Sequence, residues 1–155
     1  MAGSDETPPV VIDLDGSTNS SLGHTVRFAN LILQRELASR ISQLGFTLME
    51  WYTLRTLWET DNLSQADLAE RSGIPGSGMV GAVQSLMAKG HIVRERCADD
   101  KRKFIISLTP SGQSLKTAGI AASLDTNAAA TKGISREDLI TCLRVLKQAE
   151  RNLRG

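Results

Sequence analysis

A cluster of cationic side chains between residues 89 and 103 is the clearest candidate for chemistry in this sequence. The segment holds six cations against three acids, so its charge is about +3 while the rest of the chain carries about −2. The whole chain has a formal net charge of only +1, so any affinity for nucleic acid must come from this local placement of charge. The cations are Lys89, Arg94, Arg96, Lys101, Arg102 and Lys103.

Within this cluster, Arg102 is the candidate for a specific contact. Asp100, two residues earlier, can hold the guanidinium in a fixed pose, which insertion into a narrow minor groove of DNA requires. The alternative is an ordinary solvated arginine on a hairpin. The neighbouring cations are expected to meet phosphates, which gives affinity and salt dependence without sequence choice; they are Arg94, Arg96, Lys101 and Lys103.

Two short helices must support this cluster. Ser64, three residues before Asp67, can cap a first helix from about Gln65 to Ser72. Gly73 can take the left-handed conformation that ends this helix, and a short turn then leads into the next one. A second helix is predicted from about residue 77 to residue 89, with one buried face formed by Val80, Val83, Leu86 and Met87.

The exposed face of the second helix is predicted to meet a partner. Gln84 can pair with adenine and Ser77 can meet a base or a phosphate, although no cation precedes Lys89 on this helix. Gly78 and Gly81 each cost about 1 kcal/mol relative to alanine, so we expect them to allow close approach of DNA or of a neighbouring helix. The face comprises Ser77, Gly78, Gly81, Gln84 and Ser85, and Gln65 of the first helix completes the candidate DNA contacts.

A β-hairpin is predicted after Gly90, which ends the second helix. Its strands run from Ile92 to Cys97 and from Lys103 to Leu108, and residues 98–102 form the tip. The second strand is expected to turn Phe104, Ile106 and Leu108 inward. Helix, turn, helix and basic hairpin is the order of a winged helix-turn-helix, whose second helix enters a DNA major groove while the hairpin reaches the flanking minor groove.

These residues also resemble the MarR family of bacterial regulators over roughly residues 22–115. The resemblance lies in LSQADLAERSGI and LMAKGHIVRERCADDKRKFIISLTPSG. Asp100 and Arg102 match the family's Asp-x-Arg wing tip, and the closing Leu-Thr-x-x-Gly is present at Leu108, Thr109 and Gly112. The resemblance implies a homodimer that binds a double-stranded DNA operator and responds to a small ligand.

A dinucleotide-binding loop is the main rival interpretation of the same segment. Glycines at 76, 78 and 81, followed by a helix, a strand and the acids Asp99 and Asp100, imitate that fingerprint. The fingerprint requires a buried strand immediately before the first glycine. Residues 63–75 read as helix and turn, so we disfavour this interpretation.

Longer helices are predicted on both sides of the winged segment. Residues 22–44 form one apolar stripe, Thr47 with Glu50 starts a second helix in a capping box, and Pro110 opens another helix through about Ala130. The fold class is therefore mainly α with a small β-hairpin wing. We predict a poorly ordered arm at 1–20, a dimerisation region at 21–46 and 110–155, and a DNA-binding domain at 47–109. The last helix, started by Ser135, offers a dimer seam at Leu139, Leu143, Leu146, Ala149 and Leu153.

An effector site is implied by the family resemblance, because relatives often bind aromatic or phenolic ligands between the dimer helices and the DNA-binding domain. We predict an aromatic carboxylate or its thioester as the ligand, with its ring against Trp51 and its carboxylate on Arg27 or His24. The alternative is that these side chains are packed or solvated. The candidate set is His24, Arg27, Leu31, Trp51, Tyr52 and Arg55.

Other function classes receive little support from the sequence. No nucleophile, base and orienting group are suitably spaced, so we expect no catalysis, and we expect no metal or cofactor. Cys97 and Cys142 are too few for a disulfide framework, although an oxidant-sensing cysteine is an open alternative. Without a membrane span or secretory signal, we expect a cytoplasmic protein. The predicted function is a homodimeric repressor released by its ligand; the alternative is a winged-helix protein-interaction module.

Overall fold

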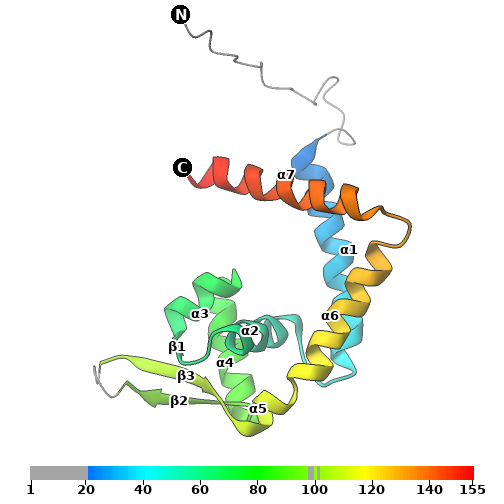
Figure 1. Ribbon diagram of the computed structural model, residues 1–155. Helices are drawn as coiled ribbons and strands as arrows, with labels where there is room; N and C mark the ends of the chain where they lie inside the picture. The colour runs from blue at the N-terminus through cyan, green and yellow to red at the C-terminus, as the bar shows by residue number, and fades with distance from the viewer. Residues whose placement is uncertain (1–20, 98–99, 101) are drawn as a thin grey trace, which may run out of the picture.

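The computed structural model describes residues 21–97, 100 and 102–155, and its architecture is mainly helical with one small sheet (Figure 1). The predicted arm and three predicted tip residues, Ala98, Asp99 and Lys101, lie outside the described residues. The predicted fold class, a winged helix-turn-helix flanked by terminal helices, is confirmed. In chain order the elements are α1 (Leu22–Ser42), α2 (Leu48–Glu59), β1 (Leu63–Ser64), α3 (Gln65–Ser72), α4 (Gly76–Ala88), β2 (Ile92–Arg96), β3 (Phe104–Leu108), α5 (Pro110–Ser114), α6 (Lys116–Ala130) and α7 (Arg136–Arg154).

Local turn chemistry sets the limits of α3 and α4. The Ser64 hydroxyl accepts a hydrogen bond from the Asp67 N–H at 3.1 Å, as predicted. Gly73 ends α3 with φ of 69°, a conformation that favours glycine. Pro75 then occupies the N-cap position of α4, so the two helices are joined by a tight turn.

The core of the winged part is formed where α2, α3, α4 and the sheet meet. The predicted buried face of α4 was half wrong. Val83 and Leu86 are buried, but Val80 and Met87 are 41% and 40% exposed. Met79 and Ala82 take their place in the core. The side chain of Met79 is fully buried against α2, where its sulfur contacts the Thr53 hydroxyl.

The sheet has three antiparallel strands in the order β1-β3-β2. The predicted hairpin is present, with Arg94 opposite Ile106 and Arg96 opposite Phe104. Ile106 is fully buried as predicted, while Phe104 and Leu108 are only half-buried. The two-residue strand β1 was not predicted; it pairs Leu63 with Ile106 and so anchors the base of the hairpin to α3.

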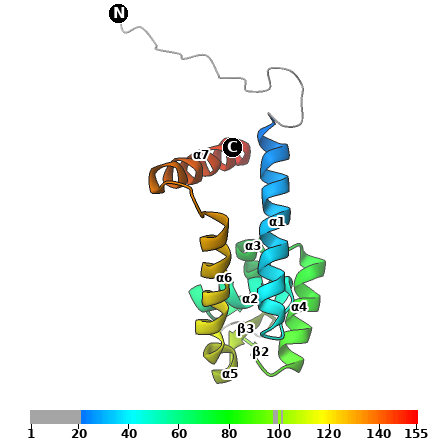
Figure 2. The same cartoon turned by 90° about the vertical axis from the view of Figure 1, so that its right-hand side faces the viewer.

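The terminal helices α1 and α6 pack on α2, beside the winged part of the molecule. α1 packs along α6, and α7 lies across the end of this pair that is farthest from the sheet (Figures 1 and 2). The helix predicted from Pro110 is broken at Leu115 into α5 and α6. No residue of α7 is fully buried, and its side chains Ile140, Leu143, Val145 and Leu153 are exposed.

Gly112 holds the junction between the wing and α5. Its N–H donates to the Thr109 hydroxyl at 3.1 Å, and its carbonyl accepts from the Trp58 indole N–H at 3.1 Å. A Cβ on this residue would lie 2.0 Å from the backbone carbonyl oxygen of His91. The closing glycine of the Leu-Thr-x-x-Gly motif is therefore required by contact between two backbone segments.

Replacing Gly112 by alanine is expected to lower the free energy of unfolding by about 3 kcal/mol or more, the upper end for overpacking, because backbone must move. Gly81→Ala is the matched control: no atom lies within 4 Å of its added Cβ. Removal of a mid-helix glycine should stabilise the protein by about 0.5–1 kcal/mol. Urea denaturation at fixed protein concentration, followed by tryptophan fluorescence, measures both. A Gly112→Ala variant as stable as the wild type would contradict this account of the junction.

Candidate nucleic-acid interface

Two cations of the wing, Arg94 and Arg96, share one face of the hairpin. The guanidinium carbons of Arg94 and Arg96 lie 4.2 Å and 4.9 Å from the centroid of the Phe104 ring. Cation–π contact orients both side chains while leaving them exposed. The half-buried Phe104 is thus a platform for two arginines, a role that differs from the inward core position predicted for it.

The tip of the wing presents Arg102 to solvent. Its side chain is 96% exposed, and its Nε lies 3.8 Å from Asp100 Oδ1. The same carboxylate oxygen accepts the backbone N–H of Arg102 at 3.0 Å. Asp100 therefore shapes the turn through the backbone and holds the guanidinium only loosely, which corrects the expected fixed pose.

A hollow of about 640 Å³ separates the wing from the start of α3. It brings together three predicted DNA-binding residues, Gln65, Arg94 and Lys103, with Cys97 and Asp67 also in its lining. Lys103 is exposed. Lys101, the remaining predicted cation of the tip, lies outside the described residues.

The exposed surface of α4 differs from the predicted one. Ser77 and Gln84 are exposed as expected, and Gly81 has open space around it. Gly78 is instead close to Ile74, since an added Cβ would lie 3.2 Å from Ile74 Cγ2. Val80 and Met87 join the exposed face, so α4 presents apolar as well as polar side chains to a partner.

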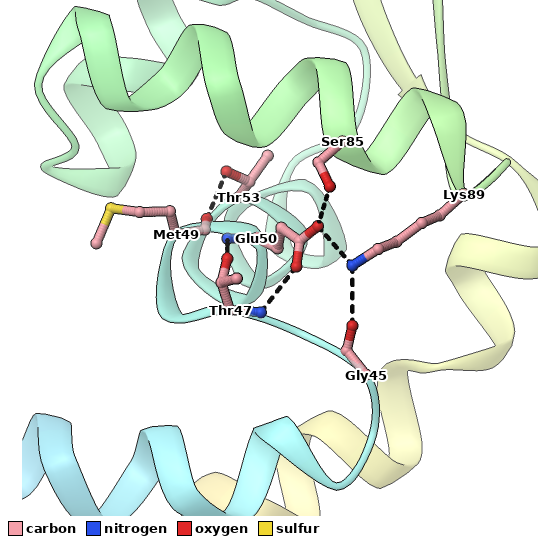
Figure 3. A network of polar contacts seen from close by, with 7 residues as sticks. All are labelled: Gly45, Thr47, Met49, Glu50, Thr53, Ser85 and Lys89. Carbon is pink, nitrogen blue, oxygen red and sulfur yellow. Dashed lines mark hydrogen bonds and ion pairs between the residues drawn. The ribbon is translucent and has the colours of Figure 1, made fainter.

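Ser85 and Lys89 face the start of α2, where they contact the buried side chain of Glu50 (Figure 3). Glu50 Oε1 accepts the Ser85 hydroxyl at 2.6 Å and the Lys89 ammonium at 2.7 Å. Its Oε2 accepts the Thr47 N–H at 2.7 Å in the predicted capping box. Burial alone would raise the pKa of Glu50, but the Lys89, Ser85 and Thr47 hydrogen bonds and the Lys89 charge outweigh it and lower that pKa.

The dinucleotide-binding interpretation fails on the backbone. The residues before Gly76 form α3 and its turn, where the fingerprint requires a buried strand. The strand that follows α4 returns as the antiparallel hairpin.

The six predicted effector residues are not brought together. Trp51 and Tyr52 lie edge to face, with ring centroids 5.1 Å apart. Arg55 forms an ion pair with Glu59. On α1, His24 and Arg27 contact Phe28 instead, and Leu31 is 55% exposed.

A hollow of about 240 Å³ does exist between α1, α2 and α6. Trp51 and Tyr52 contribute to it, but Trp51 is only 4% exposed and donates its indole N–H to the Gly119 carbonyl at 3.2 Å. Most of the polar lining was missed by the sequence prediction, because the rotation of α1 against α2 decides it. The lining is Asn30, Leu33, Gln34, Leu37, Trp51, Tyr52, Ser123, Thr126 and Asn127.

Two further features bear on function. Cys97 is half-buried on the wing and Cys142 is exposed on α7, and neither forms a disulfide in the structure. Within residues 21–97, 100 and 102–155, no helix is both long and apolar enough to cross a bilayer.

Comparisons with known proteins agree with this geometry. Residues 44–103, which include α2, the helix-turn-helix and most of the wing, match the MarR family model. A probable transcriptional regulator from Pseudomonas aeruginosa is 27% identical, with a TM-score of 0.77 over 86% of this chain and 99% of that one.

Two more distant structures share the fold. BpsR of Bordetella bronchiseptica, described with regulation of its DNA binding by 6-hydroxynicotinic acid, is 19% identical with a TM-score of 0.76, over 83% of this chain and 97% of its own. A MarR-family protein of Mycobacterium tuberculosis in complex with p-aminosalicylic acid is 23% identical with a TM-score of 0.69, over 84% and 98%. Residues 44–103 of this chain therefore match the MarR family, and the chain as a whole is similar in fold to transcriptional regulators of that family.

Proposed function

We propose that the protein is a homodimeric repressor that leaves a pseudo-palindromic operator when a small aromatic acid or its coenzyme A thioester binds, and that it acts in the cytoplasm. The DNA-binding part of the proposal rests on the wing, a hairpin that carries exposed cations. Residues 47–109 would form the DNA-binding domain, and residues 21–46 and 110–155 the dimerisation region.

The proposed DNA interface has three kinds of contact: with the minor groove, with base edges in the major groove, and with phosphates. Arg102 enters the minor groove beside the site. In the major groove, Gln84 and Ser77 meet base edges, and the exposed Val80 and Met87 suit the thymine methyl group. Gln65 and Gly78 lie at the borders of this surface. The phosphates are met by Arg94, Arg96, Lys101 and Lys103.

Dimerisation is supported by apolar side chains that the protomer leaves uncovered. Ile140, Leu143 and Leu153 of α7 are 54%, 50% and 89% exposed, and Leu31 and Ile32 of α1 are 55% and 64% exposed. Monomeric proteins seldom expose large apolar patches, and such patches mark interaction surfaces. A second copy that covers it would place two α4 helices about one DNA turn, roughly 34 Å, apart.

The hollow between α1, α2 and α6 is the proposed effector site. Tyr52 and the edge of Trp51 offer an aromatic wall, and the amides of Asn30, Gln34 and Asn127 offer hydrogen bonds. Arg27 lies one turn before Asn30 on the same face of α1, within the reach of a ligand carboxylate at the mouth. His24, Leu31 and Arg55 have a place only at the periphery of this site.

DNA selection tests the function. The purified protein is expected to select a pseudo-palindrome, with half-sites about 10 base pairs apart, from random duplexes of about 30 base pairs. Affinity for the selected duplex should fall steeply as salt rises, with a slope near −0.9 per phosphate contacted. A protein-interaction module would select no sequence, and its apolar interface would respond little to salt.

Ligand response is tested on the same duplex. Salicylate, other phenolic acids and their coenzyme A thioesters are expected to raise the Tm of the protein and to release the DNA. Asn30→Leu, which removes an amide from the hollow, should weaken both effects, whereas Thr141→Glu on α7 should leave them unchanged. DNA release that Asn30→Leu does not alter would place the effector elsewhere.

A further inference from the structure

We infer that the buried Glu50 and the partly exposed Lys89 form a clip that sets the orientation of the recognition helix α4, so that Lys89 acts as a positioning residue and not as a phosphate ligand. The inference rests on the proposed DNA-binding function. It removes from the DNA surface a cation that the sequence places in the basic cluster.

The ammonium group of Lys89 is already committed within the protein. It donates to Glu50 Oε1 at 2.7 Å and to the Gly45 carbonyl at 2.9 Å, and it lies 5.7 Å from the Phe46 ring centroid. An ammonium has three donors, and two of them are used here. A phosphate contact that drew the ammonium away would break both bonds and would leave the carboxylate of Glu50, whose side chain is 2% exposed, without its cation.

The clip ties three segments together (Figure 3). Ser85 and Lys89, one turn apart on α4, both bond to Glu50 in the first turn of α2. Lys89 also reaches the loop that follows α1, at Gly45. Two anchor points on one helix limit both its roll and its tilt, and the other end of α4 has no side-chain cap.

Substitutions that change charge can distinguish a positioning role from a direct contact with DNA. Glu50→Gln removes an acid close to the DNA-binding surface, so electrostatics alone would strengthen DNA binding. If the carboxylate orients α4, the same change weakens binding. Lys89→Met keeps the aliphatic stem and removes the charge, so a phosphate contact and a positioning contact would differ in salt dependence.

The experiment measures binding of the full-length protein to its selected operator duplex over a range of salt, well below the Tm of each variant. We expect Glu50→Gln and Lys89→Met each to weaken binding on the order of 10-fold or more, with an unchanged salt slope. The matched control is Lys103→Met on the wing. Its loss of affinity should come with a slope reduced by about 0.9 for each protomer.

Each other outcome overturns the inference. A reduced slope for Lys89→Met would make it a phosphate ligand, and stronger binding by Glu50→Gln would make the acid merely repulsive. A lowered Tm with unchanged affinity would mean that the clip only stabilises the fold. If Glu50→Gln does not fold, Ser85→Ala takes its place, because this change keeps the charges of both Glu50 and Lys89. We expect it to weaken operator binding a few-fold with an unchanged salt slope. A wild-type protein that selects no duplex would instead refute the proposed function.

Discussion

Arg102→Ala is expected to weaken operator binding by about 1–3 kcal/mol for each arginine lost, and therefore by about 2–6 kcal/mol for a dimer. The side chain of Arg102 is 96% exposed and its contact with Asp100 is 3.8 Å long, so the substitution should hardly change the stability of the fold. The reason for the loss is that a narrow minor groove concentrates negative potential, which a planar guanidinium can enter. Fluorescence anisotropy with the selected duplex measures the effect.

Two controls define what the arginine supplies. Arg102→Lys keeps the charge, so its binding should remain weakened if shape in the groove matters. Lys132→Ala removes an exposed cation from the turn between α6 and α7, at the other end of the molecule, and should leave affinity unchanged. Arg102→Ala binding like the wild type would show that the wing tip does not meet DNA.

The winged part of the fold could be predicted because its limits are set locally. Ser64 and Thr47 cap helices through bonds to the residue three positions later, and Gly73 ends a helix through its own backbone conformation. Such contacts join residues only a few positions apart, so the local sequence is enough to predict them. The cap at Ser135 was predicted for the same reason.

The buried face of α4 could not be predicted from local sequence alone. The predicted stripe of Val80, Val83, Leu86 and Met87 fits helical spacing, and so does the observed buried face of Met79, Ala82, Val83 and Leu86. The two stripes share Val83 and Leu86, and only packing against α2 and β2 selects one of them. The exposed Val80 and Met87 follow from that choice.

Long-range polar contacts were also beyond the sequence. The predicted capping box accounts for one carboxylate oxygen of Glu50. The other oxygen accepts hydrogen bonds from Ser85 and Lys89, which are 35 and 39 residues away in the sequence. The predicted effector residues do not come together for a related reason. Helical spacing places residues on one face of α1, but the angle at which that face meets α2 and α6 decides which of them reach the hollow.

Leu143→Glu is expected to separate the dimer, raising its dissociation constant by about three orders of magnitude, which corresponds to about 4 kcal/mol. Two unpaired carboxylates would enter an apolar interface, and each carries a desolvation cost of several kcal/mol. The protomer should stay folded, because no residue of α7 is buried and Leu143 itself is 50% exposed. Sedimentation over a range of concentrations, with circular dichroism, measures both properties.

Thr141→Glu provides the matched control on the same helix. Residue 141 is two positions before residue 143, about 200° around the helix, and its side chain is exposed. The same added charge there should leave the dimer intact. Separated protomers would each hold one half-site, so Leu143→Glu should also lose the avidity that two linked recognition helices give on one duplex. A Leu143→Glu protein that remains a dimer and binds its operator would place the interface elsewhere, and equal dissociation by both variants would point to charge alone.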